Sequence, residues 1–90
     1  MKGNLLIIHP RDNVGVALIL IGAGEQVSGE GLGGFSALEE IPASHKIALG
    51  DIAQGEEIIK YGETVAVAIR PIKKGEWVHT HNLESKRWKR

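Results

Sequence analysis

The chain alternates between short apolar stretches and polar turns, and one turn pattern occurs four times. Each copy starts with Ile, runs through two variable residues to Gly or Ser, and continues with a polar residue, one further position, and Val or Ile. The copies span residues 21–27, 41–47, 52–58 and 72–78. Each copy predicts a strand end, a tight turn whose Gly adopts positive φ, and the start of the next strand. The leading Ile residues are 20, 11 and 20 positions apart, so the chain divides into two similar halves.

The apolar stretches between these turns have the length and the residue types of short strands, because β-branched and aliphatic residues dominate them. We expect strands at residues 4–9, 14–20, 45–49, 57–60, 64–69 and 77–81, with an extended segment at 35–38. No segment sustains a helical period for three turns, so at most short helical turns are expected, near residues 37–40 or 84–87. The pattern predicts a compact all-β domain.

Residues 22–34 contain six glycines, which would each weaken a helix by about 1 kcal/mol relative to Ala. We therefore expect a loop there that becomes ordered when a ligand binds. The segment lacks the Lys-Ser or Lys-Thr ending of a phosphate-binding loop, and no helix is expected to follow it, which excludes that interpretation.

Composition narrows the class of protein. Ninety residues, 42% of them hydrophobic, predict a single small domain. We place this domain at residues 1–83 and a basic tail or linker at residues 84–90. Eleven basic residues against eleven acidic ones leave no net charge, which argues against a partner made of nucleic acid.

The chain contains no cysteine, so it has neither disulfides nor thiolate metal sites, and we expect a cytoplasmic protein. Its apolar stretches are too short for a signal peptide or a membrane-spanning helix, so no membrane association is expected.

His79 and His81 are the first candidates for chemistry. If they lie on a strand, their spacing of two places both rings on one face, where they can meet one metal ion or one anionic ligand. A third metal ligand would have to come from His9, His45, Asp12 or another chain. The alternative is a pair of surface histidines on an edge strand, with Trp77 in the core.

His45 and Lys46 are the second candidates. They occupy the two turn positions at which the other three copies carry Glu25-Gln26, Glu56-Glu57 and Glu76-Trp77, so a basic pair replaces the acid in one copy. Such a break in an otherwise consistent pattern is typical of a functional site, although a solvent-facing turn also explains it. Asp12 and Asn13 fit a turn closed by their own side chains or a polar cluster against a ligand.

Four motifs, in this order, resemble the N-terminal SAF domain of the altronate/galactarate dehydratase family. They are residues 9–18, 41–49, 60–63 and 75–83, and the most specific is Trp77-Val78-His79-Thr80-His81-Asn82-Leu83. The resemblance implies a β-clip fold, in which long hairpins wrap around a pseudo-twofold axis. Two features depart from the family pattern: Ser44 replaces the usual Gly, and residues 22–34 look longer and richer in glycine than the corresponding turn.

The resemblance also implies which residues act. The positions that match the family's recurring polar residues are His45, His79 and His81, expected to be catalytic, and Asp12, Asn13, Lys46 and Asn82, expected to bind substrate. We expect these groups to bind or gate the substrate rather than to supply the central base. The imidazoles and the Lys46 ammonium are expected to converge on one pocket mouth that another polypeptide completes.

In the family, the small domain accompanies a much larger catalytic domain or subunit. The resemblance therefore implies dehydration of a sugar acid such as altronate or galactarate, with a divalent metal, Fe2+ or Mn2+, on that partner and none on this chain. Two alternatives remain: the alpha subunit of a sulfolactate sulfo-lyase, and a non-catalytic SAF module for ligand binding or assembly. Edge strands in so small a domain also favour a homo-oligomer.

Overall fold

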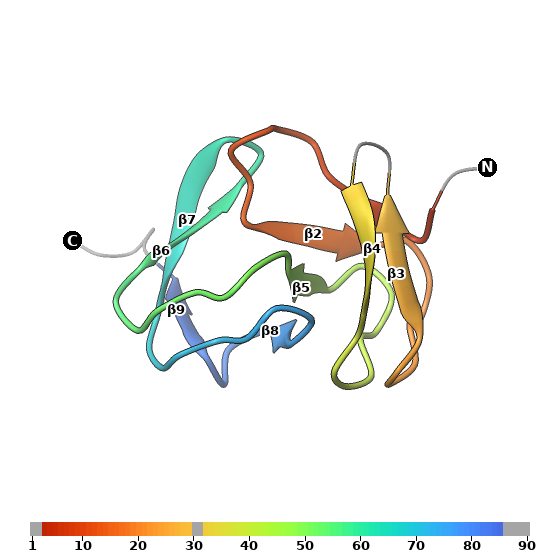
Figure 1. Ribbon diagram of the computed structural model, residues 1–90. Helices are drawn as coiled ribbons and strands as arrows, with labels where there is room; N and C mark the ends of the chain where they lie inside the picture. The colour runs from red at the N-terminus through yellow and green to blue at the C-terminus, as the bar shows by residue number, and fades with distance from the viewer. Residues whose placement is uncertain (1–2, 30–31, 86–90) are drawn as a thin grey trace.

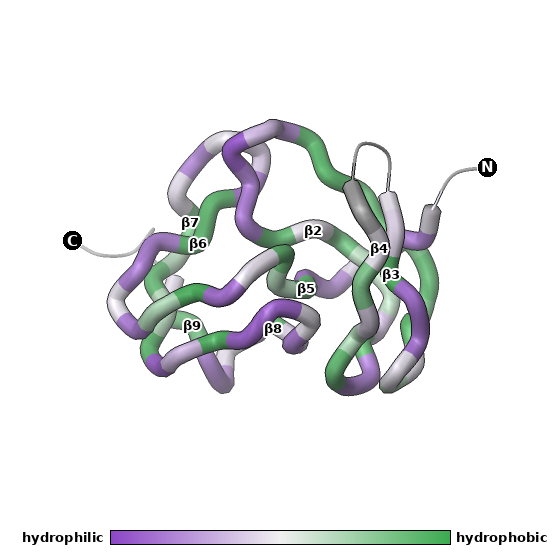
Figure 2. Tube along the Cα trace, in the orientation of Figure 1, coloured by the Kyte–Doolittle hydropathy of each residue, from purple (hydrophilic) through white to green (hydrophobic). Residues whose placement is uncertain are grey.

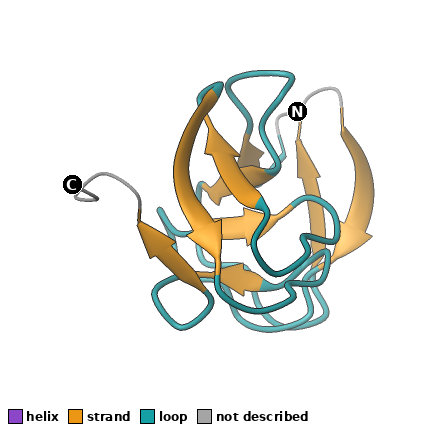
Figure 3. Cartoon of the chain, turned by 90° about the vertical axis from the view of Figure 1, so that its left-hand side faces the viewer, coloured by secondary structure: helices purple, strands orange, loops and turns teal. Residues whose placement is uncertain are grey.

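The computed structural model describes residues 3–29 and 32–85, and every regular element in these ranges is a strand (Figures 1 and 3). The strands are β1 (Leu5–Leu6), β2 (Val14–Ala17), β3 (Gln26–Gly29), β4 (Leu32–Ser36), β5 (Lys46–Ala48), β6 (Glu57–Lys60), β7 (Glu63–Ala68), β8 (Trp77–Val78) and β9 (Leu83–Ser85). They form three antiparallel sheets, in the orders β1-β2-β5-β8, β3-β4 and β6-β7-β9. The all-β prediction is confirmed, and the arrangement is consistent with a SAF-like β-clip.

The four repeated turns share one backbone geometry. The fourth residue of each copy has positive φ, with values of 82° at Gly24, 71° at Ser44, 89° at Gly55 and 90° at Gly75. In each copy the amide of the fifth residue donates to the carbonyl of the second, at 2.9 to 3.1 Å. Ser44 adopts the same left-handed conformation as the three glycines, at the steric cost that a Cβ brings there.

Two cores lie on opposite sides of the sheet that contains β2, β5 and β8. One core consists of Val14, Ala48, Ile52, Ile58, Ala66, Ala68, Ile72 and Val78, and the other of Leu5, Ala17, Ile21, Val27, Ala37, Ile41 and Ile47. Neighbouring residues of β5 belong to different cores because successive strand side chains point to opposite faces. Figure 2 shows hydrophobic segments along β2 and β6, and hydrophilic residues at many of the turns.

The two cores are related by the internal repeat. Six of the seven residues in the second core have a counterpart in the first, 31 positions later in the chain. The first residues of the repeated turns follow the same equivalence. Ile21 forms an antiparallel β-bridge with Ile41, and Ile52 forms the equivalent bridge with Ile72. The predicted division into two similar halves is therefore present in the packing.

The loop predicted at residues 22–34 is wrong, because β3 and β4 form a hairpin at the right of Figure 1. Val27 is fully buried in the second core. Gly29 lies so close to β1 that a Cβ on it would be 2.9 Å from the Leu5 carbonyl oxygen. At this position, glycine permits close packing of two backbones rather than mobility.

Several predicted strands are shorter in the structure. The apolar run 14–20 is a strand only as far as Ala17, and Leu18, Ile19 and Leu20 are 49%, 58% and 54% exposed. The strand predicted at 4–9 is reduced to β1, and the one predicted at 77–81 to β8. The strands predicted at 57–60 and 64–69 are confirmed as β6 and, shifted by one residue, β7.

The sequence pattern did not indicate β9. It pairs with β7, with Ser85 opposite Ala66 and Glu84 opposite Val67. The domain boundary predicted after residue 83 therefore falls inside a strand, and residues 86–90 of the predicted tail lie outside the described residues. Residues 37–40 contain no helical turn. Nothing in the described ranges is a helix long and apolar enough to cross a bilayer.

Candidate functional site

Three histidines surround Trp77 where β5 begins and β8 ends. Ile47 of β5 lies opposite Trp77 of β8, which brings His45 beside His79. The ring centroids of His45 and His79 are 5.0 Å apart, and the His79 ring stacks on the indole at 5.4 Å with an interplanar angle of 7°. The His81 ring is 5.3 Å from the indole. The three histidines predicted to be catalytic thus form one cluster with Trp77, which we call the histidine cluster.

A hydrogen bond fixes the tautomer of His45. The Nε1–H of Trp77 donates to His45 Nδ1 at 3.1 Å. Because an indole nitrogen only donates, Nδ1 must be unprotonated, and the neutral ring carries its proton on Nε2. His45 therefore offers an N–H to a ligand oxygen, and it has no second lone pair for a metal while this bond is intact.

The repeat explains why residue 45 differs from its counterparts. In three copies, a Glu carboxylate accepts a hydrogen bond from the backbone amide three residues earlier: Glu25 from Gly22, Glu56 from Ala53 at 2.6 Å, and Glu76 from Lys73 at 2.7 Å. In the remaining copy the earlier residue is Pro42, which has no amide hydrogen. A Glu at position 45 would find no donor there. Residue 45 is therefore not needed for the hydrogen bond that closes the other three turns, and it is a histidine in place of Glu.

His79 and His81 do not lie on one strand face, as the sequence predicted, because β8 ends at Val78. Residues 79–82 form a turn in which the Asn82 amide donates to the His79 carbonyl at 3.0 Å. The Asn82 side chain is 1% exposed, and it accepts a hydrogen bond from the His79 amide at 2.9 Å and donates to the Trp77 carbonyl at 2.8 Å. Asn82 therefore holds the turn that presents both imidazoles.

The pKa of His79 is lowered by its partial burial first, and then by the positive charges that the neighbouring His45, Lys46 and His81 carry when they are protonated. The ring is therefore neutral at neutral pH and has an unprotonated nitrogen available to accept a proton. Since the unfolded chain binds this proton more readily, acidification below the ordinary histidine pKa of about 6.5 weakens the fold.

We expect Lys46→Met to raise the pKa of His79 toward its ordinary value, because the substitution removes one of the charges that oppose protonation. The measurement is a pH titration of the histidine ring signals by NMR. Lys73→Met is the matched control, since Lys73 is exposed and is not among the charges that act on His79. A His79 pKa at or above 6.5 in the unaltered chain would contradict this electrostatic description.

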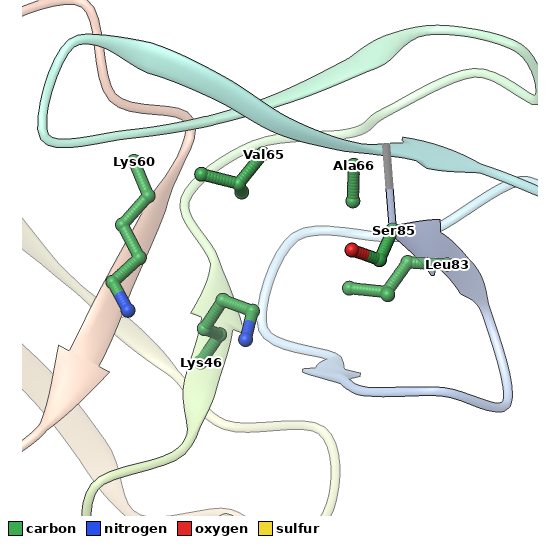
Figure 4. Close-up of a pocket in the computed structure, with 6 residues that line it drawn as sticks. All are labelled: Lys46, Lys60, Val65, Ala66, Leu83 and Ser85. Atoms are coloured by element: carbon green, nitrogen blue, oxygen red, sulfur yellow. The ribbon is translucent and has the colours of Figure 1, made fainter. Parts of the chain in front are cut away.

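Lys46 does not join the imidazoles in one pocket, contrary to the expectation. It follows His45 directly in the chain, and as the first residue of β5 it points to the opposite face of the sheet, toward the core that contains Val78. There it lines a cavity together with Lys60 (Figure 4). Its charge still acts on His79 across the strand.

Asp12 ties the turn at residues 9–13 to the hairpin between β6 and β7. Its carboxylate accepts hydrogen bonds from the amides of His9 at 3.1 Å and Gly62 at 2.8 Å. Desolvation raises the pKa of Asp12, but the backbone hydrogen bonds from Gly62 and His9 are among those that outweigh it, so the net pKa is below its ordinary value. The carboxylate is therefore ionised and engaged with the backbone at neutral pH.

Asn13 acts in the same way. Its side chain donates to the Glu57 carbonyl at 2.9 Å and accepts from the Ile59 amide at 2.7 Å, so both ends bond to β6. Asp12, Asn13 and Asn82, three of the four residues expected to bind substrate, thus use their polar atoms to hold backbone segments. Their contact with a substrate stays a prediction.

The histidine cluster does not fit a metal held by this chain alone. In residues 3–29 and 32–85, no three His, Cys, Asp or Glu side chains are placed to hold an ion together. The Fe2+ or Mn2+ expected on a catalytic partner stays a prediction.

Two residues of interest were missed at the sequence level. Trp77 does pack against the second core, as expected, but it also forms the centre of the histidine cluster. The repeat contains a signal for this second role, because the sixth position is polar in the other copies, as Gln26, Lys46 and Glu57. Lys60, whose side chain reaches the same cavity as Lys46, has no such signal.

Comparison with known proteins places this arrangement in a family. Residues 3–86 match the model of the altronate/galactarate dehydratase SAF domain. The chain is 34% identical to the (2R)-sulfolactate sulfo-lyase subunit alpha of Chromohalobacter salexigens, over 91% of this chain and 95% of that subunit. It is 40% identical to the altronate dehydratase of Escherichia coli K12, over 87% of this chain but 16% of the dehydratase. For the galactarate dehydratase (L-threo-forming) of the same organism, the identity is 39%, over 79% of this chain and 13% of the enzyme. The chain spans only a small fraction of either dehydratase, and it belongs to the SAF domain family of the altronate and galactarate dehydratases.

Proposed function

We propose that this chain is the small component of a lyase that acts on a hydroxylated acid, and that the histidine cluster is its contribution to the active site. The observation that carries the proposal is the convergence of His45, His79 and His81 on Trp77 from two separate segments of the chain. The family supports a dehydratase of altronate or galactarate. The alignment over 95% of a sulfo-lyase alpha subunit favours a second candidate, elimination from (2R)-sulfolactate.

Both reactions make the same chemical demands. A proton must leave the carbon next to the carboxylate, a group must depart from the following carbon, and the negative charge that develops needs hydrogen-bond donors. The Nε2–H of His45 is such a donor, and the neutral ring of His79 accepts a proton near neutral pH. We assign to the cluster the binding of substrate oxygens and the passage of protons. The central base and a divalent metal, which would help the leaving group depart, belong to the larger partner in this proposal.

The surface beside the cluster supports a partner. Leu18, Ile19 and Leu20 are consecutive and each about half exposed. They directly follow Ala17, whose backbone bonds to Ser44 and His45. Exposed apolar patches of this kind mark protein contacts. The equivalent residues in the other half, 49–51, are Leu, Gly and Asp, so the fold itself does not require this apolar run.

The proposal is tested by combining the chain with the large lyase subunit of the same organism and supplying altronate, galactarate or (2R)-sulfolactate. We expect a stable complex in the cytoplasmic fraction, and product formation by the complex but by neither part alone. The acid that reacts identifies which of the two candidates is correct. Absence of a complex and of product with all three acids would contradict the proposal and favour a non-catalytic SAF module.

A further inference from the structure

A second group of polar side chains lies on the face of β5 opposite the histidine cluster. Lys46 of β5 and Lys60 of β6 line an open cavity of about 180 Å³. Its remaining walls come from β7 and β9, through Val65, Ala66, Leu83 and Ser85. Figure 4 shows the two lysines approaching the cavity from separate strands, with the Ser85 hydroxyl on its far side.

The Lys60 ammonium lies 4.9 Å from the centroid of the exposed Tyr61 ring, and its charge acts on Lys46. Burial lowers the pKa of Lys46, and the nearby charge of Lys60 lowers it further. The acids on these strands are Glu57 of β6, Glu63, which pairs with Lys60, and Glu84 of β9, and all three are exposed. A half-buried lysine between the apolar neighbours Val16 and Val78 costs desolvation energy.

The internal repeat shows that the scaffold does not require a lysine here. Equivalent residues of the two halves are 31 positions apart in the chain. Residue 46 is therefore equivalent to residue 77, and residue 60 is equivalent to residue 29. The equivalent positions carry Trp77, which belongs to the histidine cluster, and Gly29. The duplicated fold thus offers two equivalent faces, and each carries a different set of polar groups.

From this arrangement we propose that Lys46, Lys60 and Ser85 form a binding site for the acid group of a small organic anion, a carboxylate or a sulfonate. Two ammonium groups supply the charge for one oxyanion, and the hydroxyl supplies a further donor. The apolar walls formed by Val65, Ala66 and Leu83 suit a short carbon chain. This site lies on the face of β5 opposite the histidine cluster, and its binding of an anion can be measured without the proposed lyase function.

The test uses the 90-residue chain without any partner and follows the side-chain NMR signals of the lysines. Sodium acetate, sodium methanesulfonate and sodium phosphate are titrated separately, each against sodium chloride at equal ionic strength. We expect saturable shifts at Lys46 and Lys60 with acetate or methanesulfonate, and the better ligand distinguishes carboxylate from sulfonate as the natural class.

Lys46→Met and Lys60→Met are each expected to raise the Kd at least tenfold, whereas the exposed-lysine control Lys73→Met leaves it unchanged. Met is apolar and nearly as long as Lys, so the Lys46 variant keeps the wall of the cavity and the fold. Shifts that fail to saturate, that are reproduced by chloride, or that persist with the same Kd in Lys46→Met would overturn the proposal. Because no lyase partner is present, a negative result here says nothing against the proposed function.

Discussion

Replacement of Asn82 by Ala is expected to lower the free energy of unfolding by about 2 to 4 kcal/mol, since each buried backbone group left unsatisfied costs about 1 to 3 kcal/mol. The side chain is buried, and it bonds at one end to the His79 amide and at the other to the Trp77 carbonyl. Its removal leaves both groups without a partner. Urea denaturation followed by circular dichroism measures the effect.

His81→Ala is the matched control, because His81 is an exposed residue of the same turn. Its effect on stability is expected to stay within about 0.5 kcal/mol. Asn82→Asp keeps the size and the acceptor, but it loses the donor to Trp77 and places negative charge near a carbonyl, so it too is destabilising. If Asn82→Ala folded as stably as the unaltered chain but lost substrate binding, the role implied by the family resemblance would hold and the structural role would fail.

The repeated turns could be predicted from sequence because their geometry is local. A single residue with positive φ and one hydrogen bond define each turn. In three of the four turns that residue is a glycine, Gly24, Gly55 or Gly75, which can be recognised in the sequence. Strand length was harder to predict, because it depends on pairing between distant segments. The run from Val14 to Leu20 has uniform strand propensity, yet it leaves the sheet after Ala17, where its pairing with β1 and β5 ends.

The hairpin in the glycine-rich segment could not be predicted for a related reason. A glycine in a sequence can mean a mobile segment or a place where two backbones pack closely. Which of the two applies depends on the segment that lies against the glycine in the fold. At Gly29 that neighbour is the backbone of Leu5, 24 positions earlier in the chain, which no local pattern identifies.

The candidate site was predicted in part. The break in the repeat at His45 and the pair His79 and His81 pointed to residues that do converge. The reasoning for the pair was wrong, since a turn rather than a strand face brings both rings to Trp77. The separation of Lys46 from His45 follows from the alternation of side chains along β5.

Loss of an imidazole from the cluster is expected to have the largest effect on activity. In the complex with the large lyase subunit, His45→Ala and His79→Ala should each lower kcat/KM by about 100-fold or more, the range typical of a positioned proton donor or acceptor. The double variant should lose less than the product of the two effects, because both rings contact the same indole and each other.

Gln54→Ala is the control for these variants, because Gln54 is exposed in an equivalent turn that carries no histidine. Its kcat/KM should match that of the unaltered chain. Circular dichroism and co-purification with the large subunit establish that each variant folds and still binds its partner, so that a loss of rate reports on the cluster itself.

The most direct single measurement is kcat/KM of the His79→Ala complex on the acid that the unaltered complex consumes. With the complex intact, we predict a loss of at least about 100-fold. An undiminished kcat/KM would show that the imidazoles gathered around Trp77 take no part in the reaction.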